Sequence, residues 1–447
     1  MALNSTLVKS TVVAALGGLL FGFDTAVIAG ATSQLTTSFQ LSDSGLGLTV
    51  SIALWGTVAG ALLAGIPGDR YGRRDSLRVM AVLYLLSALG SAFAPNWALL
   101  VISRFIGGLA IGGSSVLGPM YIAEVAPARW RGRLVGFFQF NVVAGILLAY
   151  FSNYVVGLCL QGGPLEWRWK LGISAVPAAL FFLMLFTIPR SPRWLARVGR
   201  TEEARAVLEA IGEDNIEAEL AAMQTSFELE QQQGKERLFT ARNRLPIFLA
   251  VSIAMFNQLS GINAILYYLN DIFARAGFNK VSSDLQAVAI GATNLLFTML
   301  AMSIIDKAGR RTLMLTGSVG TALSLAGVAA IFWTGRHETL LVWLLIGFIA
   351  SFAFSQGAVI WVYISEVFPT AVRARGQSLG SSTHWVMNAL ISWAFPIVAA
   401  HSKAAPFVFF SSMMALQFFL VLFFYPETKN IVLEDMEKAI LHENAEI

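Results

Sequence analysis

The sequence predicts an all-α membrane protein in which twelve transmembrane helices form two six-helix bundles, with short cytoplasmic helices between them. Of the 447 residues, 56% are apolar and only 13% are charged, which is about half the charge of an ordinary soluble chain. The apolar residues gather in runs of about 20, long enough to cross a hydrocarbon core of roughly 30 Å. Three motifs recur in the same order in both halves, and this repeat predicts the two bundles.

The apolar runs, taken in order, predict six helices in each half. The first run, Val12–Gly30, is long and has no early small-residue cleavage pattern, so we expect a membrane helix there and not a signal peptide. The expected helices are 10–31, 47–67, 76–94, 98–121, 133–156 and 169–189, then 245–270, 284–305, 312–333, 340–365, 378–399 and 405–425.

The predicted domains are an N-terminal bundle at 1–189, a linker at 190–244, a C-terminal bundle at 245–425 and a tail at 426–447. The linker is rich in charged residues of both signs. Its segments Thr201–Ile211 and Asn215–Glu230 have amphipathic helical spacing and acidic starts. We therefore expect short surface helices in the linker and not a catalytic domain.

The basic residues predict the orientation of the chain in the membrane. Of the 31 Lys and Arg residues, 24 fall on one predicted side, six fall on the other, and Arg104 lies within a helix. This asymmetry places both termini in the cytoplasm. The net charge of +4 thus reflects membrane orientation and does not indicate a nucleic-acid partner.

The internal repeat indicates a duplicated six-helix unit. Tyr121–Pro127 recurs as Tyr363–Pro369, at an offset of 242 residues. Asp69–Arg74 recurs as Asp306–Arg311, at an offset of 237, and Pro189–Arg193 recurs weakly at the same offset, from Pro426. Such repeats are typical of secondary transporters, whose substrate is held near mid-membrane between the halves.

The repeated charged loops predict a set of cytoplasmic ion pairs, here called the cytoplasmic latch. We expect acids and arginines of these loops to pair with each other or with carboxylates at other helix ends when the cytoplasmic face is shut. The alternative is that these charges only determine topology. The residues assigned to the latch are Asp69, Arg70, Arg74, Glu124, Arg131, Arg193, Asp306, Arg310, Glu366 and Arg375.

Asp24 and Arg104 are charged residues inside predicted membrane helices, where each charge costs roughly 2.5–3.5 kcal/mol on insertion scales unless it is paired. Asp24 is about 21 Å from the cytoplasmic end of the first helix, and Arg104 is about 9 Å from the outer end of the fourth. In a core of roughly 30 Å the two lie at the same depth, so we expect them to meet. An arginine lowers the proton affinity of a carboxylate and burial raises it, so a pair that breaks and reforms can take up and release a proton. A static ion pair is the alternative.

The chain resembles the sugar porter family of the major facilitator superfamily from about Gly17 to Lys429. The resemblance is carried by short motifs in a specific order: Gly22–Val27, Gly68–Arg74, Pro119–Glu124, Arg131–Arg133, Trp167–Trp169, Ser191–Leu195, Gln258–Asn263 and Pro426–Lys429. It implies the major facilitator fold, working by alternating access. It also implies that Asp24 and Arg104 couple transport to protons, because proton-coupled members have an Asp at that position and facilitators often have an Asn.

The resemblance also implies the residues that bind a sugar. Amide side chains both donate and accept hydrogen bonds, as sugar hydroxyls do, and tryptophan offers a flat apolar face with an N–H group. The same side chains serve in other membrane proteins only to join helices, which is the alternative here. The assigned residues are Phe21, Gln139, Asn257, Gln258, Asn263, Tyr267 or Tyr268, Asn294, Trp361, His384 and Trp385.

Some positions depart from the family pattern. Asn257 stands where a second Gln is usual, His384 stands where Gln or Asn is expected, and Ile146 replaces a Gln of some members. These departures prevent the transfer of any named sugar. Arg190 replaces the usual Glu of the Pro-Glu-Ser-Pro-Arg motif, which removes an acid from the cytoplasmic latch and is expected to weaken the outward-open state. Reversion, Arg190→Glu, should then change the inward/outward ratio in a cysteine-accessibility assay.

The predicted function is proton-coupled symport of a monosaccharide or related polyol across the plasma (inner) membrane by a monomer that needs no cofactor or metal. A passive sugar facilitator is the first alternative, and a drug or metabolite exporter or a transporter-like sugar receptor ranks lower. An enzyme is not expected, because the chain has no Walker motif, no His-Glu-x-x-His and no nucleophile elbow. Cys159 is the single cysteine, which excludes an internal disulfide.

Overall fold

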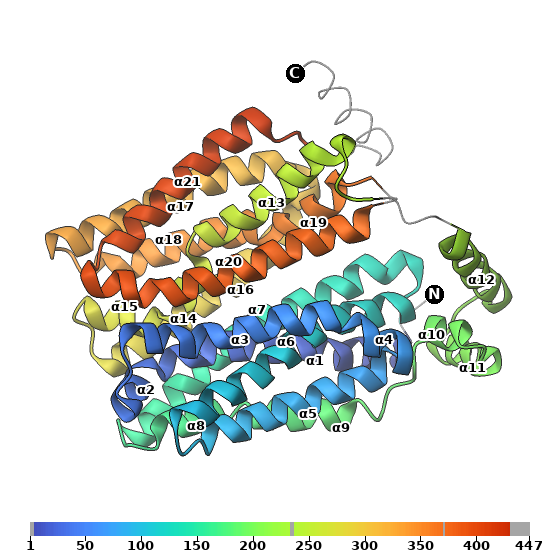
Figure 1. Cartoon of the computed structure of the whole chain (residues 1–447), viewed down its shortest axis with the longest axis horizontal. Coiled ribbons are helices and arrows are strands. Elements are labelled where there is room, and N and C mark those ends of the chain that lie inside the picture. Colours follow the sequence, from blue (N-terminus) through green and yellow to red (C-terminus); the bar gives the residue numbers. More distant parts are fainter. Residues whose placement is uncertain (1–3, 233–236, 370–371, 430–447) are drawn as a thin grey trace. The chain divides into compact units, whose positions relative to one another are not determined.

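The computed structural model describes residues 4–232, 237–369 and 372–429, and within these ranges all regular structure is helical (Figure 1). The chain divides into two compact units. The first comprises Met1–Gln34 and Ile52–Gly234, and the second comprises Leu35–Ser51 and Lys235–Ile447. Each unit has its own apolar core, built in the first around residues such as Tyr121 and Phe181, and in the second around residues such as Tyr363.

The helices of the first unit begin with α1 and end with the short helices of the linker. In chain order they are α1 (Ser5–Val27), η1 (Ile28–Gly30), α4 (Gly65–Tyr71), α5 (Arg73–Ala92), α6 (Trp97–Val125), α7 (Ala128–Leu160), α8 (Glu166–Gly172), α9 (Ala175–Met184), α10 (Pro192–Arg197), α11 (Thr201–Ile211) and α12 (Ile216–Gln232). Residues of α2 (Thr32–Phe39) and α3 (Asp43–Leu63) are shared between the two units.

The helices of the second unit follow the linker. They are η2 (Ala241–Asn243), α13 (Arg244–Leu259), α14 (Ile262–Tyr267), α15 (Leu269–Arg275), α16 (Lys280–Ala308), α17 (Arg310–Thr334), α18 (Leu340–Phe354), α19 (Gln356–Val367), α20 (Arg373–His401) and α21 (Ala405–Phe424). Gly261 lies between α13 and α14 and adopts the left-handed region, with φ of 78°.

Ten segments of the described chain are long and apolar enough to cross a membrane, and they correspond to ten of the twelve predicted spans. The expected sixth span, 169–189, is instead interrupted between α8 and α9. Pro177 has no N–H group to donate to the carbonyl of Ile173, so the helix breaks there. The eleventh span, 378–399, lies within the long α20, whose polar side chains lower its apolar character.

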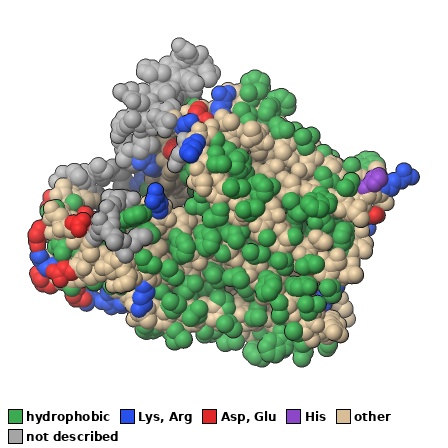
Figure 2. All heavy atoms as spheres, turned by 180° about the vertical axis from the view of Figure 1, so that it is seen from behind, with side chains coloured by type: hydrophobic (Ala, Val, Ile, Leu, Met, Phe, Trp, Pro, Cys, Tyr) green, Lys and Arg blue, Asp and Glu red, His purple; other side chains and the backbone are tan. Residues whose placement is uncertain are grey.

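The surface of the helices is largely apolar. Side chains such as Ile66, Phe93, Leu183, Trp333 and Phe423 are more than half exposed. Figure 2 shows hydrophobic side chains over most of one face, with the Lys, Arg, Asp and Glu side chains gathered toward its margins. This distribution suits helices whose sides contact lipid.

The turn that starts α5 has the same geometry as the turn that starts α17. Gly72 has φ of 89° and ψ of 157°, and Gly309 has φ of 90° and ψ of 153°. A positive φ is readily adopted only by glycine. The duplicated Asp-Arg-x-Gly-Arg-Arg motif therefore folds in the same way in both units.

Glycines on α1 and α7 bring these two helices into close contact. A Cβ atom built on Gly22 would lie 1.8 Å from the carbonyl oxygen of Val142, and one built on Gly145 would lie 2.1 Å from that of Leu19. Small residues that allow backbones to approach are a usual means of packing membrane helices. The contact orients the face of α1 that carries Asp24.

We expect Gly22→Ala to destabilise the protein by about 1–3 kcal/mol, because the added methyl group overpacks against rigid backbone. The thermal unfolding midpoint in detergent should fall by several degrees. Gly132→Ala is the matched control, since nothing lies within 4 Å of its added Cβ atom and alanine favours a helix interior. Equal midpoints for the two variants would contradict the close α1–α7 contact.

Candidate functional site

Asp24 and Arg104 meet inside the first unit. Asp24 lies near the end of α1, and its Oδ2 atom is 3.5 Å from Nη2 of Arg104 on α6. The Arg104 side chain is 4% exposed and that of Asp24 is 18% exposed. Nε of Arg104 is buried and has no hydrogen-bond partner among the described residues. The long contact and the unused donor leave this pair less tightly bonded than a bidentate Arg–carboxylate pair.

The end of α1, just after Asp24, is held by polar side chains that the sequence did not single out. The amide of Asn153 donates to the carbonyl of Val27 at 3.0 Å, and Nζ of Lys170 donates to that of Gly30 at 3.0 Å. Lys170 also forms an ion pair with Glu166 at 2.8 Å, and both side chains are fully buried. These contacts satisfy carbonyls at the C-terminal ends of α1 and of η1, which follows it, where carbonyls have no partner within the helix.

Three predicted binding residues of the second unit form a chain of amides. Nδ2 of Asn263 donates to Oε1 of Gln258 at 3.0 Å, and Nε2 of Gln258 donates to Oδ1 of Asn257 at 3.0 Å. Nε2 of Gln258 is also 3.3 Å from both ring nitrogens of His384 on α20. Asn257 continues the chain toward α19, where its amide donates to the carbonyl of Gln356 at 3.4 Å.

Aromatic rings lie beside this amide chain. The ring of His384 is 5.0 Å from that of Trp361 on α19 and 5.1 Å from that of Trp385, the second pair in an edge arrangement. Trp361 is 40% exposed, whereas Trp385 and His384 are buried. Trp361 therefore offers an accessible aromatic face next to hydrogen-bonding groups.

Tyr267 and Tyr268 are buried and lie beside α20. The amide of Asn388 donates to the hydroxyl of Tyr267 at 3.3 Å, and the hydroxyl of Tyr268 donates to the carbonyl of Ser392 at 3.0 Å. The ring of Tyr268 also stacks on Phe395. Both tyrosines thus fasten α14 and the turn after it to α20.

The other predicted binding residues belong to other helices. Phe21 on α1 and Gln139 on α7 are partly buried residues of the first unit. Asn294 on α16 is 7% exposed and makes no hydrogen bond to the amide chain in the part of the structure that is described.

Some buried amides within the membrane helices of the second unit were not predicted. Gln356 and Asn388 contact the assigned residues as described above, and both are buried. Gln417 on α21 is fully buried, and its amide nitrogen and oxygen have no partner among the described residues. In each case, the only sign in the sequence that could have indicated these residues was an amide side chain within an apolar run.

Two acids assigned to the cytoplasmic latch, Asp69 and Glu124, form ion pairs in the first unit, but with an arginine that was not assigned to it. Arg73, and not Arg74, binds Glu124, with its Nε atom 3.0 Å from Oε1, and it also binds Asp69 at 2.7 Å. The hydroxyl of Ser191 donates to the other oxygen of Glu124 at 2.5 Å. Arg74 turns away and pairs with Asp75 at 3.0 Å.

The second unit repeats this arrangement. Nη2 of Arg310 lies 2.9 Å from Oε1 of Glu366, and the hydroxyl of Thr428 donates to Oε2 of Glu366 at 2.6 Å. Arg310 and Thr428 follow Arg73 and Ser191 by the same 237 residues. The repeat is therefore preserved at the level of individual contacts.

The remaining residues assigned to the latch are spread over several elements. Arg70 lies over the ring of Tyr71, and Arg193 donates to the hydroxyl of Ser226 on α12 at 3.0 Å. Arg131 on α7 and Arg375 on α20 are exposed. The side chain of Asp306 lies outside the described residues.

Comparison with known proteins finds sugar transporters along almost the whole chain. Residues 10–440 match the family model described as sugar (and other) transporter. The chain is 35% identical to the D-xylose-proton symporter of Escherichia coli, covering 97% of this chain and 96% of the relative. It is 37% identical to the arabinose-proton symporter of Bacillus subtilis, covering 95% and 93% of the two chains.

Solved structures resemble the chain over a similar extent. The inward-open conformation of the xylose transporter XylE from E. coli matches with a TM-score of 0.86 and 34% identity, covering 97% of this chain and 99% of that one. The proton:xylose symporter XylE bound to 6-bromo-6-deoxy-D-glucose matches with a TM-score of 0.78 and 34% identity, covering 97% of this chain and 99% of that one.

Proposed function

The chain belongs to the sugar (and other) transporter family, and from this premise we propose that it carries a monosaccharide or related polyol across the plasma membrane together with a proton. The observation that carries the proposal is the Asp24–Arg104 pair between two membrane helices. Relatives named as proton symporters of xylose and arabinose support the coupling. We propose that both termini are cytoplasmic, that the domains follow the boundaries expected above and that the protein works as a monomer.

The proton step follows from the pairing of Asp24. When the guanidinium of Arg104 lies beside the carboxylate, it stabilises the ionised form. When the pair separates, a carboxylate that stays in an apolar environment is stabilised by binding a proton. We propose that the two conformations of the transport cycle differ in this pairing, so that sugar and proton move together.

The sugar step is assigned to the amide chain and the aromatic rings beside it. Gln258 and Asn263 are joined by a hydrogen bond, and sugar hydroxyls can replace such bonds because they both donate and accept. The exposed face of Trp361 suits the C–H face of a sugar ring. The buried His384 is assigned a hydrogen-bonding role beside Gln258.

We expect Gln258→Ala to weaken sugar binding by about tenfold to a hundredfold, because a buried polar partner is left without a hydrogen bond at about 1–3 kcal/mol. The measurement is a binding isotherm on purified protein. Gln377→Ala, at an exposed position of α20, is the control. If Gln258→Ala lowered stability but left the affinity of the folded protein unchanged, the amide chain would serve only to join helices.

The ion pairs Arg73–Glu124 and Arg310–Glu366 are assigned to the cytoplasmic latch. Their repetition in both units supports a shared role, since a single copy would be adequately explained by topology. We propose that the two pairs hold the cytoplasmic ends of their helices in the arrangement that one state of the cycle requires.

The experiment that tests the function is uptake into proteoliposomes, with hexoses, pentoses and inositols offered one at a time. We expect one compound to accumulate when a proton gradient is imposed and to equilibrate without accumulating when it is not. Equal final levels under both conditions would favour the second candidate, a passive facilitator, in which Asp24–Arg104 is a static ion pair.

A further inference from the structure

The two units differ at one position of their repeated cytoplasmic turns. In the second unit the carboxylate of Glu427 accepts hydrogen bonds from the backbone N–H groups of Arg310 and Arg311, at 2.9 and 3.1 Å. The residue that precedes Glu427 by the repeat offset of 237 is Arg190. A guanidinium has no acceptor, so Arg190 cannot cap the start of α5 as Glu427 caps the start of α17.

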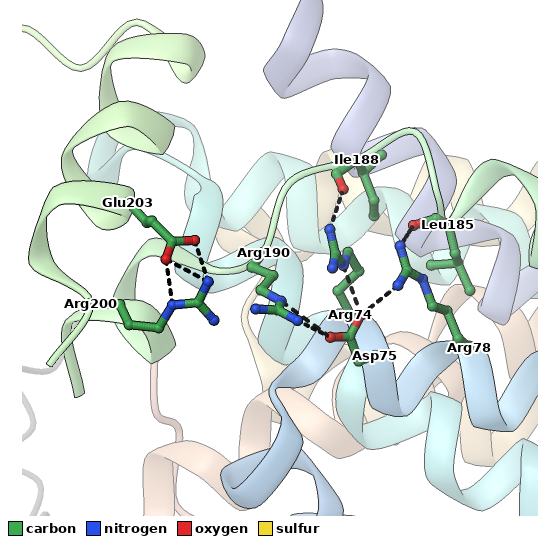
Figure 3. Close-up of polar contacts among 8 residues, drawn as sticks. All are labelled: Arg74, Asp75, Arg78, Leu185, Ile188, Arg190, Arg200 and Glu203. Atoms are coloured by element: carbon green, nitrogen blue, oxygen red, sulfur yellow. Dashed lines mark hydrogen bonds and ion pairs between the residues drawn. The ribbon is translucent and has the colours of Figure 1, made fainter. Parts of the chain in front are cut away.

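Arg190 instead joins a group of arginines around one carboxylate. Its Nε and Nη2 atoms lie 3.2 and 3.0 Å from Oδ2 of Asp75, in the first turn of α5. Oδ1 of Asp75 accepts from Arg74 at 3.0 Å and from Arg78 at 2.8 Å. Figure 3 shows the three guanidinium groups converging on Asp75. We call Arg74, Arg78 and Arg190 the arginine cluster.

The arginine cluster carries more positive charge than Asp75 can balance. Three guanidinium groups surround one carboxylate, which leaves a surplus of two charges. The neighbouring acids have their own partners: Asp69 and Glu124 bind Arg73, and Glu203 binds Arg200 (Figure 3). Among the described residues no other carboxylate pairs with the cluster.

The corresponding place in the second unit is close to neutral. Arg311 and Glu427 occupy the positions of Arg74 and Arg190, and the positions of Asp75 and Arg78 are occupied by Thr312 and Leu315. The surplus of charge is therefore a property of the first unit alone.

An apolar surface extends from the arginine cluster along α5 and α9, which pack together. Val79 and Leu86 on α5 are each 54% exposed, Leu183 on α9 is 64% exposed, and Phe186, just after α9, is 56% exposed. The guanidinium of Arg78 lies 4.1 Å from the centre of the Phe186 ring. The distance along the helix from Asp75 to Leu86 is about 16 Å, which is about half the thickness of a hydrocarbon core.

We propose that the arginine cluster binds the phosphate of an anionic phospholipid, whose acyl chains lie against the exposed apolar side chains of α5 and α9. The phosphate supplies the negative charge that Glu427 supplies in the second unit. Arginine is well suited to this role, because its planar group binds phosphate oxygens in pairs. The adjoining apolar surface, one leaflet long, favours a lipid over a soluble phosphate. This inference rests on the proposed membrane topology and not on the identity of the transported substrate.

The test is native mass spectrometry of the purified full-length protein with phosphatidylglycerol, phosphatidylcholine or glycerol 3-phosphate added. We expect selective retention of phosphatidylglycerol. Each basic group near an anionic lipid contributes about 1 kcal/mol, so Arg190→Gln should weaken binding about fivefold and Arg190→Glu about thirtyfold. Arg190→Lys should retain most of the affinity.

Arg200→Glu is the matched control, since it changes charge equally at an exposed arginine outside the cluster. Arg78→Gln provides a second test if an Arg190 variant does not fold. Equal binding of the two lipids, or equal effects of Arg190→Glu and Arg200→Glu, would overturn the proposal. Binding of glycerol 3-phosphate as tight as that of the lipid would also overturn it, by assigning the cluster to a soluble phosphate. Lipid retention is measured without transport, so a failure of the proposed symport leaves this result interpretable.

Discussion

Asp24→Asn should abolish accumulation of the sugar while leaving exchange of sugar across the membrane intact. Asparagine keeps the size and polarity of the side chain, so it can still face Arg104, but it cannot carry a proton. A difference of one pH unit is worth about 1.4 kcal/mol per proton, so a symporter that moves one proton per sugar accumulates it about tenfold. The variant should reach a ratio of about one.

The measurement is labelled-sugar uptake by proteoliposomes with an imposed pH gradient and the membrane potential clamped. Asp43→Asn is the control, because Asp43 is an exposed acid in the first turn of α3. Accumulation by Asp24→Asn at the level of the unaltered protein would refute the assignment of Asp24 as the proton carrier.

Lys170→Met should destabilise the protein by about 3–5 kcal/mol, because it leaves the carboxylate of Glu166 buried without its partner. Both side chains are fully buried, and Lys170 also donates to the carbonyl of Gly30 at the end of η1. The thermal unfolding midpoint in detergent is the measurement. We expect a decrease several times larger than that caused by removing an exposed ion pair.

The double variant Glu166→Leu/Lys170→Met separates the ion pair from its surroundings. Replacing both partners of a buried pair by apolar side chains is often nearly neutral, so the double variant should recover most of the lost stability. The double variant should not recover the full stability, because two hydrogen bonds are also lost. These are the bond from Lys170 to the carbonyl of Gly30 and the bond from the backbone N–H of Gly162 to Glu166. A double variant as unstable as Lys170→Met alone would contradict this account of the pair.

The proximity of Asp24 and Arg104 was predictable because helix geometry converts residue number into depth. Two opposite charges at one depth, each costly alone, are expected to pair, and the structure places them 3.5 Å apart. Their role in proton transfer stays a prediction. The break at Gly261 within the expected span 245–270 was not predicted, although the positive φ found there is one that glycine adopts readily.

The partner of Glu124 was not predictable from the motif alone. Arg73 and Arg74 are adjacent, so they point to different sides of α5, and the sequence does not say which one faces α6. The structure selects Arg73. The pairing of Arg190 with Asp75 was missed for a related reason, because the two lie 115 residues apart and belong to different elements.

The Glu166–Lys170 pair shows a third limit of sequence analysis. An acid and a base four residues apart are ordinary on an exposed helix face, and nothing in their spacing shows that both would be fully buried. The interruption between α8 and α9 was missed because Pro177 stands inside an otherwise continuous apolar run.

The most direct test of symport is the external pH of proteoliposomes containing the purified protein, recorded as each hexose, pentose or inositol is added. We predict that one compound causes alkalinisation outside, and that Asp24→Asn abolishes the change. Exchange of a sugar without any change in pH would contradict proton coupling and make the protein a facilitator.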